Sequence, residues 1–462
     1  MKLTRRQLLG SAAGGALGAA GVYELVDRLA GSSPDRAVAA AAPPEQHVLD
    51  GVRVVRDGGV EVLVPPLHHE VVTAKLTIGP SDLPDAQRTL EEALARLDRR
   101  YEASPAGLGV TLAWGLPYFE RFVPAAWRVH APQDRRAMRP ALLPTRRFPS
   151  DPQEVLLEDN DLAVLLRSDR REHIDDAAQT LFEQGGPFRL TSIRKGFAGG
   201  GFDGGRSLPK RVAVAAGVPG ADLIPESAEL FLGFTSTQRT GLGPRKIVNF
   251  EALGLVELGD GYFREGTHMH LSHIDEQLDT WYQLFDFRDR VDTTFRPGLS
   301  VAPGTLTVRQ AQEDVSAPAD VREDFRRVST IGHSAALQTA SRLQADHVAE
   351  DGTVYRAGTA IPHRADFNTL DNPFFWSANR VRDGMSDGSA AGVHFVVFNP
   401  SSDDFERVRL AMDGVLPDGT RLEFTPGRGR QGFNSVLRTT HRQNFLVPPR
   451  RHRAFPLAEL QT

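Results

Sequence analysis

The stretch from His69 to Ala103, HEVVTAKLTIGPSDLPDAQRTLEEALARLDRRYEA, contains the two patterns that decide the fold. Its first eleven residues alternate between apolar and polar side chains, which predicts a β-strand over residues 69–79. After Pro80, leucines recur at roughly helical spacing, which predicts an amphipathic helix. A helix of this kind buries its apolar face against a sheet, so the stretch indicates a layered fold of helices and strands.

The segments that follow complete the order strand–helix–strand–strand–helix–strand. The further strands are predicted at residues 107–115, 159–169 and 188–197, and the second helix at residues 171–184. This order is that of the ferredoxin-like unit. A similar series of segments is predicted at residues 228–236, 261–274, 275–285, 390–399 and 402–415. We therefore predict an α+β fold of two ferredoxin-like units, of the dimeric α+β barrel type and packed sheet to helix, over residues 43–215 and 216–462.

The first residues have the features of an export signal. A basic head with paired Arg5 and Arg6 precedes a weakly apolar run from Leu8 to Val22, and small residues at 37–42 offer cleavage sites. The run is too short and too rich in glycine and alanine for a comfortable membrane span. We predict a twin-arginine signal peptide at residues 1–42, which would direct the protein through the twin-arginine export machinery to a periplasmic or extracellular location. Cleavage of this leader and its retention as an anchor both stay open.

Composition excludes several classes of function. The hydrophobic content of 40% and the charged content of 24% are ordinary for a soluble globular protein. The net charge of -5 argues against a nucleic-acid surface. The chain has no cysteine, which excludes disulfides, thiolate chemistry, iron–sulfur clusters and cysteine-based zinc sites. The glycine-rich residues 199–207 lack the lysine of a phosphate-binding P-loop.

Two groups of histidines are candidates for chemistry. In THMHLSHID, His268 and His270 share one face of the predicted strand and could hold a metal ion such as copper, while His273 points to the opposite face. In GHSAALQTASR, His333 is followed by small, uncharged residues that would let a flat ligand approach closely. His333 is thus a core residue, a general base or a ligand of a cofactor, and the residues alone leave these three readings open.

Several motifs, taken in their order along residues 65–462, resemble those of the dye-decolourising peroxidases, a haem enzyme family built from two ferredoxin-like units. The matching pieces are GLGVTLAWGLPYFERF, FPSDPQEVLLEDNDLAVLLRSD, LFLGFTSTQ, GYFREGTHMHLSHIDEQLDTWYQL and AGVHFVVFNPSSDDFERV. The resemblance implies haem b as the cofactor, and hydrogen peroxide and a small organic reductant as substrates. It also implies that His333 is the proximal iron ligand and that Arg356, in TVYRAGTAIP, is the distal arginine.

An imidazole that ligates iron needs an acceptor for its other N–H, which fixes the ring and raises its basicity. Asp275, Glu276 or a backbone carbonyl could serve. On the other haem face, an arginine that stays protonated would stabilise the negative charge that develops as the peroxide bond breaks.

The chain departs from the family at the motif Gly-Phe-x-Asp-Gly. Gly233 and Phe234 match it and would contact the cofactor, but Ser236 stands where the family has its acid–base aspartate. A hydroxyl with no neighbouring base cannot take a proton near neutral pH, so we expect weakened peroxidase activity. Asp203, in the glycine-rich connector, is a candidate for a substitute carboxylate, whereas Gly358, at the place of a further distal polar group, offers none.

Two other functions remain open from the sequence. The chain could be a haem-free binding protein that keeps the two-unit scaffold, which the altered motif at Ser236 favours. It could also be a metal-dependent oxidoreductase that uses His268 and His270. No nucleic-acid partner is expected, and assembly into a homo-oligomer is left open.

Overall fold

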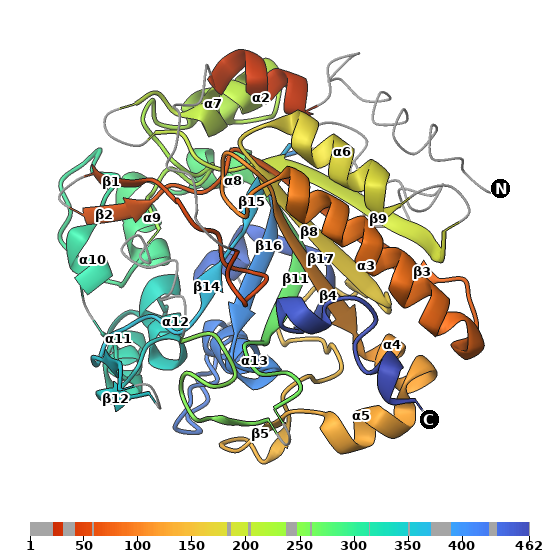
Figure 1. Cartoon of the computed structure of the whole chain (residues 1–462). Coiled ribbons are helices and arrows are strands. Elements are labelled where there is room, and N and C mark those ends of the chain that lie inside the picture. The colour runs from red at the N-terminus through yellow and green to blue at the C-terminus, as the bar shows by residue number, and fades with distance from the viewer. Residues whose placement is uncertain are drawn as a thin grey trace.

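The computed structural model describes residues 22–30, 42–57, 60–182, 186–201, 205–236, 247–258, 261–313, 315–349, 352–370, 390–424 and 432–461. It has the predicted α+β architecture, with strands at its centre and helices around them (Figure 1).

The first unit is folded as its sequence predicts. Its elements are β3 (His68–Leu76), α3 (Leu83–Arg100), β4 (Gly109–Gly115), β8 (Leu162–Ser168), α6 (Arg171–Leu181) and β9 (Phe188–Phe197). The strands lie side by side in the order β9-β3-β8-β4, all antiparallel. Leucines of α3 and outward-facing residues of β8 and β4 form one apolar core cluster, which fixes the helices on the outer face of the sheet.

The second unit repeats this strand order with a different set of elements. They are β11 (Thr267–Glu276), α8 (Leu278–Leu284), β15 (Phe367–Thr369), β16 (Gly392–Asn399), α13 (Ser402–Met412) and β17 (Leu437–Val447). The strands lie in the order β17-β11-β16-β15, which again places the last strand beside the first. The predicted helix at residues 275–285 is shorter than expected, because its first two residues belong to β11.

The strand predicted at residues 228–236 is not formed. Gly233 has φ +85°, which turns the chain. Side chains of α8, and not a neighbouring strand, satisfy the backbone here: Trp281 Nε1 donates to the Leu232 carbonyl at 2.9 Å and the Tyr282 hydroxyl donates to the Phe231 carbonyl at 2.7 Å. The segment is therefore a loop anchored on α8.

The two four-stranded sheets join into a closed barrel. β4 pairs with β17 and β9 pairs with β15, while β17 also pairs with β11 inside the second unit. The eight strands therefore form a ring in which each has two neighbours. The barrel interior holds an apolar cluster that includes Val71, Leu165, Met269, Val396 and Phe445.

A long insertion between α8 and β15 supplies a second layer. Its elements are α9 (Phe287–Thr294), α10 (Arg309–Glu313), α11 (Pro318–Val328), α12 (His333–Ser341), β12 (His347–Val348), β13 (Val354–Tyr355) and β14 (His363–Arg364). α12 packs against α13, which itself lies on β11 and β16. β14 adds to the edge of β16. The remaining elements are β1 (Val54–Asp57), β2 (Val60–Leu63), α4 (Leu116–Phe122), α5 (Pro124–His130), β5 (Gln133–Asp134), β6 (Arg139–Pro140), β7 (Leu156–Leu157), α7 (Leu208–Ala215) and β10 (Val256–Glu257).

One helix, α2 (Val22–Ala30), lies within the predicted signal peptide and contacts α7 and β9. Val22, Tyr23 and Val26 are buried, and Asp27 Oδ1 lies 2.7 Å from His68 Nε2. The paired arginines and the proposed cleavage sites fall outside the described residues, so the export signal stays a prediction. Within the described part of the chain, no helix combines the length and apolarity needed to cross a bilayer.

Candidate functional site

The second unit contains a cavity of about 300 Å³, at the lower end of the size range of ligand sites. Its floor is the outer face of the barrel, where alternate residues of β11 and β16 point into it. These are Ser272, Ile274, Glu276, Val393, Phe395 and Val397. Helices α12 and α13, the loop before residue 237, residues 362–368, strand β2 and residues 150–152 contribute to the wall. The site is thus built between the barrel and the insertion.

His333 enters this cavity as the first residue of α12. A close backbone approach fixes its position: a Cβ on the preceding Gly332 would lie 2.2 Å from the Phe295 carbonyl oxygen, which itself accepts a hydrogen bond from Ala335 N at 3.0 Å. Only glycine fits at 332. The start of α12 is therefore held firmly against the end of α9, and the imidazole is presented to the cavity.

The His333 imidazole is neutral. Burial, together with the charges of Arg364 and Arg409, lowers its pKa to about 3. Its Nδ1 is sealed from solvent and has no hydrogen-bond partner among the described residues. A neutral imidazole with one unsatisfied nitrogen can bind a metal centre, and it is too weak a base to take a proton near neutral pH.

Neither proposed carboxylate accepts a hydrogen bond from His333 Nδ1. Asp275 points to the opposite face of β11, where its oxygens lie 3.7 Å from His273 Nε2 and 3.9 Å from Arg438 Nη1. Glu276 does line the cavity. The predicted role of these carboxylates as acceptors for the histidine is therefore wrong for the geometry seen here.

Arg356 does not reach the cavity, which corrects its assignment as the distal arginine. It follows β13, with 76% of its side chain exposed, and pairs with Asp346 at 2.5 Å on the surface. Arg364 does line the cavity, because β14 pairs with β16 and so lies beside the floor. Its Nε lies 3.4 Å from Asp366 Oδ1.

The loop held by α8 brings two of its predicted residues to the cavity. Phe234 and Ser236 line it, and the Phe234 ring packs edge-on against Phe295 at 5.0 Å between centroids. Gly233 does not line the cavity; it supplies the turn, since a Cβ there would lie 2.7 Å from the Tyr282 hydroxyl. Asp203 lies outside the described residues.

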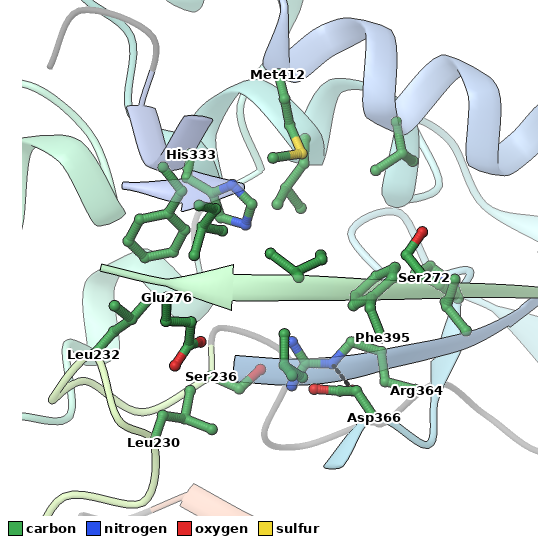
Figure 2. Close-up of a pocket in the computed structure, with 18 of the residues that line it drawn as sticks. Leu230, Leu232, Ser236, Ser272, Glu276, His333, Arg364, Asp366, Phe395 and Met412 are labelled. Carbon is green, nitrogen blue, oxygen red and sulfur yellow. Dashed lines mark ion pairs between the residues drawn. The ribbon is translucent and has the colours of Figure 1, made fainter. Parts of the chain in front are cut away.

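Figure 2 shows how these groups face one another. The His333 imidazole enters the cavity from one side of β11, and the side chains of Ser236 and Arg364 lie on the other side. The Glu276 carboxyl is turned toward the side that carries Ser236. The side of the cavity opposite the imidazole therefore presents a hydroxyl, a guanidinium and the carboxyl groups of Glu276 and Asp366.

A further polar corner was not anticipated from the sequence. Arg442, with 1% of its side chain exposed, contacts Asp151 at 2.6 Å and stacks over Phe148 at 4.8 Å. Arg409 of α13 shares both partners, and both arginines line the cavity. Arg409 also pairs with Asp413 at 2.9 Å, so two arginines and two carboxylates form a charge-compensated corner.

The histidines proposed as a copper site do not form one. The two ring nitrogens of His270 contact Asn444 Oδ1 at 2.7 Å and Ser272 Oγ at 2.6 Å, and its ring stacks on Phe405 at 3.5 Å. His268 is completely buried beside it on the same strand face. In the described ranges, no group of three or more histidine or carboxylate side chains is arranged to hold a metal ion. These histidines are packing residues beneath α13.

Comparisons with known proteins agree with this architecture. The model of a family described as "Family of unknown function (DUF7405)" matches residues 66–449. No curated protein matches the chain. The crystal structure of the DyP-type peroxidase from Cellulomonas bogoriensis is 18% identical, with a TM-score of 0.50, over 88% of this chain and 96% of that chain. Ferric DtpA from Streptomyces lividans is 17% identical, with a TM-score of 0.49, over 86% and 94%. The first likeness shows a shared fold and confirms the expected two-unit architecture.

Proposed function

The chain belongs to the DUF7405 family, and we propose that it is a haem b protein that reacts with hydrogen peroxide and oxidises a small organic reductant. The observation that carries this proposal is His333. It places a neutral imidazole in a cavity whose opposite wall carries an arginine.

The residues present fit a haem group. His333 would hold the iron, since its imidazole is unprotonated and faces the cavity. The floor residues Val393, Phe395 and Val397 and the side chain of Phe234 offer apolar surface to a macrocycle. Arg364 stands on the opposite side of β11 from His333. Haem, when bound, supplies an iron that reacts with peroxide and takes up electrons from the reductant.

The chain's own groups have separate tasks in this proposal. His333 binds and orients the cofactor. The guanidinium of Arg364 would attract and orient a peroxide and stabilise negative charge on its oxygens. Ser236 can donate a hydrogen bond or position a water molecule, but it cannot act as the base.

A haem titration with two histidine variants tests the proposal. The wild-type protein is expected to give a Soret band with one haem per chain. His333→Ala should weaken haem binding by at least about 100-fold, which corresponds to about 2.8 kcal/mol, because the iron loses its protein ligand. His130→Ala, at the end of α5 and outside the cavity, should bind haem like the wild type.

A wild-type protein without a Soret band but with normal thermal stability would contradict the proposal. It would favour the alternative that the sequence left open, a haem-free binding protein, which the serine at position 236 also suggests. A Soret band that survives unchanged in His333→Ala would place the haem elsewhere and equally remove the proposal.

Location and assembly remain part of the proposal. The leader with Arg5 and Arg6 supports export through the twin-arginine machinery to a periplasmic or extracellular location. Export of the folded protein would let the cofactor be inserted before the membrane is crossed. A homo-oligomer is compatible with this function.

A further inference from the structure

Of the carboxyl groups that line the cavity, those of Glu276 and Asp366 are left unexplained by the proposed function. Glu276 is the last residue of β11, and Asp366 follows β14 by two residues. Both line the cavity together with Ser236. The serine cannot act as an acid or a base here. Glu276 and Asp366 place acid–base groups in the cavity at positions other than the aspartate position of the family motif.

Glu276 has the surroundings of a proton donor. It lies on the same strand face as Ser272 and Ile274, which also point into the cavity. Its Oε2 is sealed from solvent, has no hydrogen-bond partner and forms no ion pair within the described part of the chain. Burial and the nearby carboxylates of Asp366 and Asp275 raise the pKa of Glu276 to about 8, so the group holds its proton at neutral pH.

Asp366 has the opposite surroundings. The Arg364 guanidinium lies 3.4 Å from its Oδ1 and compensates the negative charge of the carboxylate. Figure 2 shows this ion pair on the wall that also carries Ser236. Two carboxyl groups in one cavity, one kept neutral and one paired with a cation, are a common arrangement for an acid and a base.

We propose that Glu276 and Asp366 together carry a proton from one oxygen of a bound peroxide to the other, in place of the aspartate that Ser236 replaces. Asp366 accepts the proton of one oxygen, and Glu276 donates its proton to the second oxygen. One proton is gained and one is lost by the protein, so the peroxide keeps its two protons, and both now lie on the second oxygen. That oxygen is then ready to leave as water, and Arg364 faces the negative charge on the first.

This inference rests on the proposed function, and haem-loaded protein is needed to test it. Glu276→Gln and Asp366→Asn preserve shape and remove one titratable group each, while Glu257→Gln, on the exposed residue of β10, is the matched control. We expect the two cavity variants to slow the reaction with peroxide by about 100-fold or more, as is typical for loss of general acid–base catalysis. The control should equal the wild type.

Cyanide binding gives a readout that does not depend on turnover. Hydrogen cyanide must lose its proton when it binds as an anion, and a carboxylate in the cavity accepts that proton. Asp366→Asn should therefore raise the dissociation constant of cyanide by about tenfold, whereas Glu276→Gln, which removes a group already protonated, should change it much less.

The outcomes separate the two proposals. A wild-type protein that takes up no haem overturns the proposed function. Normal Soret bands in both variants, with wild-type rates and wild-type cyanide binding, overturn the inference alone. If Glu276→Gln were to lose haem, Glu276→Asp would decide: a rate within tenfold of the wild type supports the inference, and a rate as low as that of Asp366→Asn overturns it.

Discussion

Arg364→Leu is expected to slow the reaction of the haem-loaded protein with hydrogen peroxide by about 100- to 1,000-fold, with the Soret band retained. The guanidinium lies on the wall opposite His333 and is the positive charge nearest Asp366. Removal of one preorganised charge or donor that stabilises developing negative charge in a water-poor site has an effect of about this size. Stopped-flow absorbance after mixing with peroxide measures it directly.

Arg356→Leu is the matched control for this prediction. Its side chain is three-quarters exposed and pairs with Asp346 on the surface, an interaction that contributes little to stability. We expect a peroxide rate within twofold of the wild type and an unchanged haem affinity. If Arg356→Leu reacted slowly with peroxide and Arg364→Leu reacted at the wild-type rate, the assignment of Arg364 would be wrong. Arg356, the arginine that the family resemblance suggests, would then be the residue that acts on peroxide.

Trp281→Ala should lower the free energy of unfolding by about 3–5 kcal/mol. The Trp281 ring is completely buried in the core of the second unit, and its Nε1 holds the Leu232 carbonyl at 2.9 Å. The loss of so large a buried ring leaves a cavity and removes the anchor of the loop that carries Phe234 and Ser236. Trp281→Phe keeps most of the packing and loses the hydrogen bond, so about 1–3 kcal/mol is expected. Urea denaturation followed by circular dichroism gives both values.

A second tryptophan separates a general loss of stability from an effect on the site. Trp127 of α5 is only half-buried and stacks on Phe119 at 4.2 Å, at the edge of the first core cluster and away from the cavity. Trp127→Ala should destabilise the protein less and leave haem affinity unchanged, whereas Trp281→Ala should weaken haem binding as well. Equal haem affinities in the two variants would show that the loop does not depend on Trp281.

The first unit could be predicted from the sequence because its periodicities are clean. Helix α3 buries one regular face of leucine and alanine, while strand β3 alternates in sequence although it is buried on both faces. The apolar residues 228–236 favour a strand, but their backbone partners are side chains of α8, which no local pattern reveals. β17 was missed for the opposite reason: its segment LRTTHRQNFLV carries polar residues that the barrel nevertheless buries.

The site was predicted in part. His333 could be found because its neighbourhood has few charges and lies in the family's order of motifs. Arg356 fits the family pattern only by its distance from His333 along the chain. Both residues belong to the long insertion, and the sequence does not show how the length of this insertion changes that distance. A local pattern gives a better signal. Arg364 and Asp366 are two positions apart, and residues at this spacing lie on the same face of an extended segment. Glu276 was considered only as a partner of His333, because no pattern shows into which part of the cavity it turns.

The ring of strands has a consequence for how the polypeptide reaches its final state during synthesis. Until β17 has been synthesised, β4 and β11 each have one unpaired edge. Unpaired strand edges can pair with other chains and cause aggregation. β17 ends at Val447, so the ring cannot close before this strand has been synthesised. A polypeptide truncated before Leu437 would keep unpaired strand edges, which are prone to aggregation and accessible to proteases. Strand β17 therefore covers both open edges at once, and only molecules that contain it can become aggregation-resistant.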